Sequence, residues 1–336
     1  MTAMKAAVMH GVRDVRCEEI NRPTLAPGEA LLRVKACGIC GSDLHTYREG
    51  LFEDLGAPTD GGRVLGHEFS GEIAEINGAI EGLKVGDRVT TVGIGANAEY
   101  IRISPEMAPL VLPVPEHVSH REAATTEPLA TSLHAANLAQ VQDDERVVVM
   151  GAGIIGLGVV QCIRATSNAH ITVVDLSDKR LELAGTLGAN EVINARHEDA
   201  VAKVAPEVDP NAPLISGTQG GVDAVFDCVG APATFKGTTV LEQALTMVRQ
   251  NGRVIVVAVF ERPVEIEANV IVRKGVRMLG SWAWEPQEFV DALELISSGK
   301  IDRKPLISHE FSLDEAADAY AAQDSADTAI KVVFVP

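Results

Sequence analysis

The sequence predicts an α/β protein with two domains, an irregular all-β domain followed by a doubly wound parallel sheet. A chain of 336 residues is too long for one ordinary core and suits two. From residue 5 to about 103, short alternating apolar runs are separated by glycine and proline turns, which indicates β-strands. After about residue 130, strand-like and helix-like segments alternate, which is typical of a parallel sheet covered by helices on both faces.

The individual elements follow in chain order. Strands of the first domain are predicted in "KAAVMH", "EALLRVKA", "SGEIAEI" and "AEYIRIS". The parallel strands are "RVVVMG", "ITVVDL", "DAVFDCVG" and "GRVIVVAVF", with helices from about residue 154 and in "DKRLELAGTLG" and "TTVLEQALTMVRQ". The tail from "PQEFVDALELISSG" contains two helices and a last strand, "AIKVVFVP". Residues 204–221, with three prolines and three glycines, predict a surface loop.

The composition argues against several kinds of partner. With 29 basic and 47 acidic residues, the net charge of −18 repels phosphate backbones and anionic lipids, so we expect neither nucleic acid nor membrane as a partner. The longest apolar run, residues 147–160, is shorter than the roughly 20 residues of a membrane span. Five cysteines form no regular framework and residues 1–20 lack the layout of a signal peptide, which favours the cytoplasm.

A glycine-rich turn predicts a dinucleotide site. Directly after an apolar strand, "GAGIIG" gives the turn residues Gly151, Gly153, Ile154, Ile155 and Gly156. Such a turn lets the backbone and the N-terminus of the next helix approach a pyrophosphate. The alternative is a glycine-rich turn without a ligand.

An acidic residue at the end of the next strand predicts which dinucleotide is bound. Asp175 follows nineteen residues after Gly156, where a carboxylate accepts hydrogen bonds from ribose hydroxyls and repels a 2′-phosphate. NAD is therefore expected rather than NADP. Arg180 either stacks on the adenine or lies on the helix surface.

The stretch "CGICGSDLH", residues 37–45, concentrates reactive groups. Its C-x-x-C alone is compatible with a redox pair, half of a zinc clip or two buried thiols. A catalytic zinc needs three protein ligands and one open position. The candidate ligands in the first domain are Cys40, His67 and Glu68 of "GHE", and Glu127 of "TEPLAT".

Five ordered motifs, "CGICGSDLH", "GHEFSG", "KVGDRV", "TEPLAT" and "VMGAGIIG", resemble the zinc-dependent medium-chain alcohol dehydrogenases. A glutamate in "TEPLAT" is similar to the polyol, butanediol and threonine dehydrogenase branch. The resemblance implies a GroES-like β-barrel catalytic domain over residues 1–128 and 282–336. It also implies a Rossmann NAD-binding domain over residues 129–281.

The resemblance implies roles at the metal. Cys40 and His67 are zinc ligands, and Glu127 is a third ligand that binds directly or through water. Glu68 lies beside the metal and exchanges with water or Glu127 as the coordination changes. Asp43 accepts a hydrogen bond that fixes the ring of His67.

The resemblance also implies roles at the cofactor. Thr131 packs against the nicotinamide. The residues that line the adenine and carboxamide sites are Val229, Ala258, Val259, Phe260 and Ser281. Lys331 either reaches the pyrophosphate or is only solvated.

One feature of the family is missing. Many relatives follow "GDRV" with four closely spaced cysteines that bind a structural zinc, but here "GDRVTTVGIGANAEYIRIS" runs straight on. We therefore expect one zinc per chain and a buried, unreactive Cys37. We also expect a homo-oligomer, a dimer or a tetramer. Because the lobe is missing, the sequence does not predict whether its subunits make the contacts that are usual in the family.

The expected reaction is hydride transfer between a secondary alcohol, diol or polyol and NAD, giving the ketone or aldehyde. Ser42 would bond to the alcohol oxygen, and His45 would pass the proton to water near neutral pH. Tyr47, Phe52, Trp282 and Trp284 either form an aromatic substrate wall or belong to the core. The alternatives are a zinc-free quinone or enoyl reductase of the same superfamily and a non-catalytic NAD-binding sensor or structural protein.

Overall fold

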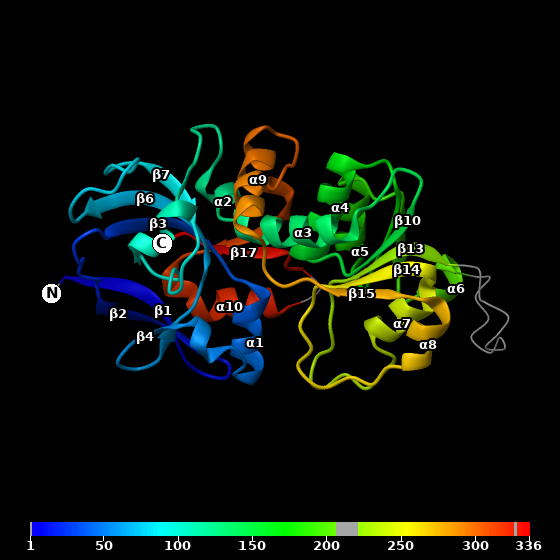
Figure 1. The fold of residues 1–336 in the computed structure, drawn as a ribbon. Helices are drawn as coiled ribbons and strands as arrows, with labels where there is room; N and C mark the ends of the chain where they lie inside the picture. Colours follow the sequence, from blue (N-terminus) through cyan, green and yellow to red (C-terminus); the bar gives the residue numbers. More distant parts are fainter. Residues whose placement is uncertain (1, 206–220, 326–327) are drawn as a thin grey trace. The chain divides into compact units, whose positions relative to one another are not determined.

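The structure, a computed structural model, describes residues 2–205, 221–325 and 328–336 (Figure 1). The chain forms two units, Met1–Pro128 with Pro286–Pro336, and Leu129–Glu285. Residues 282–285, which the sequence assigns to the catalytic domain, thus fall in the second unit. The surface loop predicted over residues 204–221 lies mostly outside the described residues.

The first unit contains two sheets. The four-stranded sheet has the order β2 (Asp14–Asn21), β1 (Ala3–Gly11), β5 (Arg63–Val64), β4 (Ala57–Pro58). The seven-stranded sheet has the order β16 (Ile307–Phe311), β17 (Lys331–Phe334), β3 (Ala30–Gly38), β6 (Glu68–Ile76), β7 (Arg88–Thr91), β9 (Leu112–Pro113), and β8 (Tyr100–Ile103) also pairs with β3. The irregular β-domain expected from the sequence is therefore present, with C-terminal strands β16 and β17 added to it.

Helices of the first unit pack against these sheets. The α-helices are α1 (Gly41–Glu49), α2 (His120–Ala123), α9 (Pro286–Ser297) and α10 (Ala316–Asp324), and α3 (Thr126–Ala139) crosses the boundary between the units. The short 3-10 helices are η1 (Glu53–Leu55), η2 (Pro105–Leu110), η3 (Lys304–Leu306) and η4 (Leu313–Glu315). One apolar cluster joins α1, α10 and β17 through Leu44, Tyr47, Tyr320 and Phe334. This cluster matters below because α1 carries several of the predicted site residues.

The second unit is a six-stranded parallel sheet. Its order is β12 (Glu191–Asn194), β11 (His170–Asp175), β10 (Arg146–Met150), β13 (Val222–Asp227), β14 (Val248–Val256), β15 (Arg277–Gly280). Read outward from β10, this is the doubly wound order in which a dinucleotide binds where the strand order reverses. The predicted fold class is confirmed.

Helices cover both faces of the parallel sheet, and Figure 1 shows α4 on one face and α7 and α8 on the other. The helices are α4 (Ile154–Thr166), α5 (Asp178–Thr186), α6 (Ala200–Val204), α7 (Val240–Met247) and α8 (Ala268–Lys274). The central strands are buried along most of their length, as expected for a sheet that is covered on both sides.

Some elements differ from the sequence prediction. Among the elements that the sequence pattern does not predict are α1, α8, β12, β15 and β16. The strands β12, β15 and β16 have only four or five residues each, and so short a run carries little periodicity. No helix in the described part of the chain is both long and apolar enough to span a bilayer.

Candidate functional site

The reactive stretch of residues 37–45 is the end of a strand followed by the start of a helix. Cys37 lies near the end of β3. It is fully buried in an apolar cluster, which confirms the prediction that it is a buried thiol. Cys40 is the N-cap of α1, and its backbone N–H donates to the Asp43 carboxylate at 3.0 Å. This capping arrangement fixes the entry to the helix. Ser42 and His45, three residues apart, lie on one face of α1.

The candidate metal centre lies where α1 and β6 begin. The Cys40 thiol, an imidazole nitrogen of His67 and a Glu68 carboxylate oxygen all lie within 4.8 Å of one another. Cys40 and His67 are half-buried, and Glu68 is buried. Thiolate, imidazole and carboxylate are the ligand types that zinc prefers, so the donor set fits this ion.

The charges around this cluster also favour a cation. Burial raises the pKa of Cys40, and the nearby Glu68 carboxylate raises it further. Burial alone would lower the pKa of His67, but the Cys40 sulfur and the Asp43 and Glu127 carboxylates raise it well above its usual value. The shift of His67 reports negative charge from three neighbours at one buried place, which a divalent ion would neutralise.

Two other predicted residues lie near the cluster without joining it directly. The Asp43 carboxylate is 3.9 Å from Nδ1 of His67, which is ion-pair distance but longer than a hydrogen bond. Glu127, at the start of α3, is close enough to raise the pKa of both His67 and Lys331. Its oxygens lie outside the group of donor atoms within 4.8 Å of one another.

The expectations for Lys331 are wrong. Its side chain is 1% exposed, and Nζ donates to both Glu68 oxygens, at 2.9 and 2.6 Å, and to the Ile39 carbonyl at 2.8 Å. An ammonium has three donors, and these three bonds use them all. Lys331 therefore neither reaches a pyrophosphate nor lies in solvent. The reason is the position of β17, which places Lys331 beside the end of β3 and the start of β6.

The helix α1 also presents two predicted proton-transfer residues. The Ser42 hydroxyl oxygen is buried and has no hydrogen-bond partner among the described residues, so it can bond to a ligand. The half-buried His45 ring lies 6.2 Å from the Phe52 ring in an edge-on arrangement. Phe52 has a φ of 59°, an uncommon conformation for a bulky residue and one that recurs near functional sites.

In the second unit, the turn after β10 has the geometry of a phosphate-binding loop. Gly151 has a φ of 96°, and a Cβ on Gly156 would lie 1.8 Å from the Gly151 carbonyl oxygen, so both positions require glycine. A Cβ on Gly153 would meet nothing within 4 Å. Within the turn, only Gly153, Ile154 and Ile155 are partly exposed, and they form the N-terminus of α4. This places an open backbone surface where anions bind.

Asp175 connects this turn to the next strand. One of its carboxylate oxygens accepts the Ala152 N–H at 2.7 Å, and the other accepts the N–H groups of Leu176 and Ser177 at 2.8 Å. The carboxylate is half-exposed, so its remaining lone pairs can accept ribose hydroxyls.

Most other predicted cofactor residues lie at the same edge of the sheet. Each follows the carboxyl end of a parallel strand: Val229 after β13, Ala258, Val259 and Phe260 after β14, and Ser281 after β15. The Ser281 hydroxyl is buried without a hydrogen-bond partner among the described residues. Thr131 lies on α3 and Arg180 on α5, both half-buried. Ligands of open α/β sheets bind at this edge.

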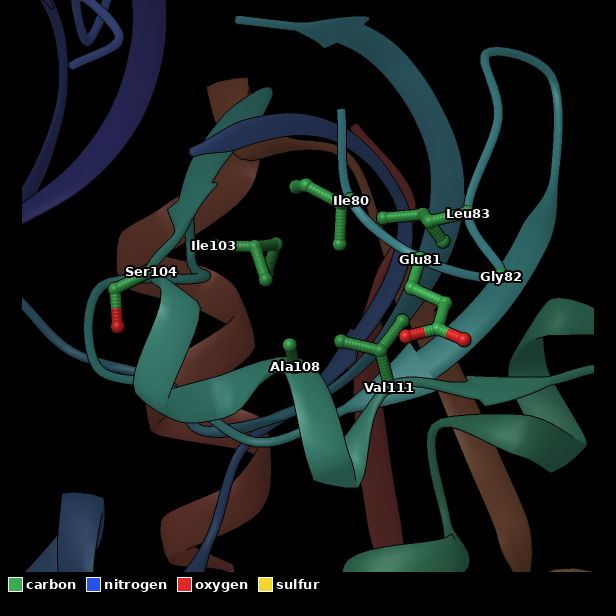
Figure 2. Close-up of a pocket in the computed structure, with 8 residues that line it drawn as sticks. All are labelled: Ile80, Glu81, Gly82, Leu83, Ile103, Ser104, Ala108 and Val111. Atoms are coloured by element: carbon green, nitrogen blue, oxygen red, sulfur yellow. The ribbon is translucent and has the colours of Figure 1, made fainter. Parts of the chain in front are cut away.

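A surface hollow elsewhere in the first unit is not part of this site. Figure 2 shows it between the loop of residues 80–83, the end of β8 and η2. Its lining mixes apolar side chains with Glu81 and Ser104, and it contains none of the residues predicted to bind metal, cofactor or substrate.

Comparison with known proteins identifies the family. Residues 26–116 match the alcohol dehydrogenase GroES-like domain, and residues 155–298 match the zinc-binding dehydrogenase domain. The chain is 30% identical to (R,R)-butanediol dehydrogenase of Bacillus subtilis strain 168, a match that covers 99% of this chain and all of the relative. It is also 30% identical to sorbitol dehydrogenase of the same strain, covering 99% and 97% of the two chains. The crystal structure of the 2R,3R-butanediol dehydrogenase from Bacillus subtilis matches with a TM-score of 0.83 and 30% identity, covering 99% of each chain.

The chain belongs to the zinc-dependent medium-chain alcohol dehydrogenases. In this alcohol dehydrogenase, sequence reasoning missed the buried pair of Lys331 and Glu68. No local signal reveals it, because the two residues are 263 positions apart.

Proposed function

We propose that the chain transfers hydride between a secondary alcohol, diol or polyol and NAD, with one zinc ion per chain. The observation that carries the proposal is the convergence of Cys40, His67 and Glu68 donor atoms within 4.8 Å. The relatives named as butanediol and sorbitol dehydrogenases support a diol or polyol substrate. A zinc-free reductase of the same superfamily is not favoured, because it has no need of this donor set.

The residues of the candidate metal centre have separate roles. Cys40 and His67 would hold zinc, with Glu68 or Glu127 as the third ligand, directly or through water, while Lys331 pairs with the Glu68 carboxylate. When bound, zinc would acidify the hydroxyl of the alcohol, and NAD would accept a hydride from the carbon that bears this hydroxyl.

The proton needs its own route out of the site. The Ser42 hydroxyl, buried and without a partner among the described residues, would accept the hydrogen bond of the substrate hydroxyl. His45, on the same face of α1 and partly exposed, would pass the proton to water, since imidazole exchanges protons near neutral pH.

The second unit would bind NAD along the carboxyl edge of its sheet. The open N-terminus of α4 at Gly153 suits the pyrophosphate, and the half-exposed Asp175 carboxylate suits the ribose hydroxyls. A 2′-phosphate would meet the negative charge of Asp175, which supports NAD over NADP.

The test is an initial-rate screen of NAD reduction with secondary alcohols, vicinal diols, polyols and threonine, combined with metal analysis. We expect activity on at least one class and about one zinc per chain. Cys40→Ala should remove both metal and activity, whereas the matched control Cys37→Ala, in the apolar cluster, should retain both. Two zinc ions per chain, or full activity of Cys40→Ala, would contradict the proposal.

We further propose that the chain forms a homo-oligomer in the cytoplasm. Within the described chain, β15 pairs only with β14 and lies at an edge of the six-stranded sheet; it carries the exposed Met278, and the preceding helix α8 carries the 80% exposed Val272. An exposed edge strand with apolar neighbours favours pairing with a second chain. None of the five cysteines, all of which the structure describes, is joined in a disulfide, which suits a reducing compartment. Light scattering of the purified protein and of Met278→Lys tests the assembly, and a monomeric wild-type protein would refute it.

A further inference from the structure

The turn that carries His67 and Glu68 is fastened to a distant segment of the first unit. The Gly66 carbonyl accepts the N–H groups of Gly95 and Ala96 at 3.1 and 3.0 Å. The Asn97 N–H donates to the Leu65 carbonyl at 2.9 Å. Since Gly66 directly precedes His67, the bonds to residues 95–97 help to fix the backbone from which this imidazole projects.

The side chain of Asn97 adds a second fastening. It is fully buried, and a Cβ on Gly66 would lie only 2.4 Å from its Oδ1. The Asn97 amide therefore occupies the space that a side chain at position 66 would take. Its Nδ2 donates to the hydroxyl of Tyr320 at 3.0 Å, a bond between two fully buried groups.

Tyr320 in turn contacts the elements that carry the other residues of the site. Its ring lies 5.3 Å from the ring of Tyr47 on α1, the helix that Cys40 caps. It lies 6.3 Å from the ring of Phe334 on β17, the strand that carries Lys331. One buried tyrosine thus contacts α1, which begins after Cys40, the Asn97 segment, which bonds to the turn before His67, and β17, which carries the lysine that pairs with Glu68.

We propose that the hydrogen bond between Tyr320 and Asn97 is a positioning contact for the metal centre, which holds the turn of His67 in register with α1. The inference rests on the metal site proposed above. Neither side chain belongs to the donor set, so both are positioning residues. Groups that hydrogen-bond to metal ligands commonly change metal affinity by about 10–100-fold when removed, and a contact one step farther from the ligands should act at the lower end of this range.

The test removes one oxygen atom. Tyr320→Phe keeps the ring and its contacts but deletes the hydroxyl that Asn97 donates to. We expect zinc release to a chelator to become about tenfold faster and the visible spectrum of the cobalt-substituted protein to shift. The matched control is Tyr47→Phe, which deletes a hydroxyl from the same aromatic cluster on the side of Arg13, and it should leave both readouts unchanged.

The outcomes are distinct. Unchanged zinc release and cobalt spectrum in Tyr320→Phe, even with lower stability, would overturn the inference, because a purely structural role predicts that result. Equal changes in Tyr320→Phe and Tyr47→Phe would also overturn it. If Tyr320→Phe does not fold, Asn97→Ser breaks the same bond from the other side and should give the same two changes. A wild-type protein that binds neither zinc nor cobalt would instead refute the metal site itself.

Discussion

Replacing Lys331 with methionine tests the energetics of the buried pair beside the candidate metal centre. Lys331 and Glu68 are each 1% exposed and joined at 2.6 Å. They pack over Gly38, where a Cβ would lie 2.3 Å from the Glu68 carboxylate. Lys331→Met leaves this carboxylate buried without its cation, which typically costs about 3–5 kcal/mol of unfolding free energy. We expect a loss of this size in metal-free protein, because there no zinc ion can substitute for the ammonium.

The assay is urea unfolding followed by circular dichroism in the presence of EDTA. The double variant Lys331→Met with Glu68→Leu should recover most of the loss, because removing both charges leaves no unpaired group. The control variant Lys5→Met breaks the exposed pair with Asp314 and should leave the midpoint unchanged. A Lys331→Met variant as stable as the wild type, or a double variant no better than the single one, would refute the reasoning.

Three further predictions concern catalysis, cofactor choice and pH. His45→Gln should slow alcohol oxidation about 10²-fold near neutral pH with zinc content unchanged. Imidazole buffer should restore part of the rate. A loss of activity that follows a loss of zinc would contradict the role of His45 in proton transfer. Asp175→Ser should reduce the preference for NAD over NADP, measured as the ratio of the two kcat/KM values, by about tenfold or more. A wild-type enzyme that uses both cofactors equally would exclude the assignment of cofactor choice to Asp175. Burial and the Arg88 charge lower the pKa of His120 from 6.5 to about 4. The unfolded chain therefore binds more protons between these values, and stability should fall as the pH drops from 6.5 to 4. After a discount for the partial exposure of the ring, the expected loss of unfolding free energy between pH 6.5 and 4 is roughly 1–2 kcal/mol. Urea titrations at several pH values should show a smaller loss for His120→Gln.

The sequence was sufficient for features that depend on local pattern. The alternation of strand and helix predicted the parallel sheet, because each element records its own burial in the spacing of its apolar residues. Gly151, Gly156 and Asp175 were found because a tight turn, a close approach and a strand end each restrict the residue type. Cys40 and His67 were proposed from their residue types and motifs, and the structure brings them together.

Tertiary structure alone decided the contacts between residues far apart in the chain. Asn97 and Tyr320 are 223 positions apart, and Lys331 and Glu68 are 263 apart. A lysine on a strand has the same local pattern whether it faces solvent or a buried carboxylate, so its environment depends on which strands pair. The addition of β17 to β3 placed Lys331 beside Glu68, and the packing of α10 placed Tyr320 beside Asn97. The sequence by itself thus determined the fold and nominated the reactive groups, whereas the folded chain determined which buried groups hold them in place, because those partners meet only after folding.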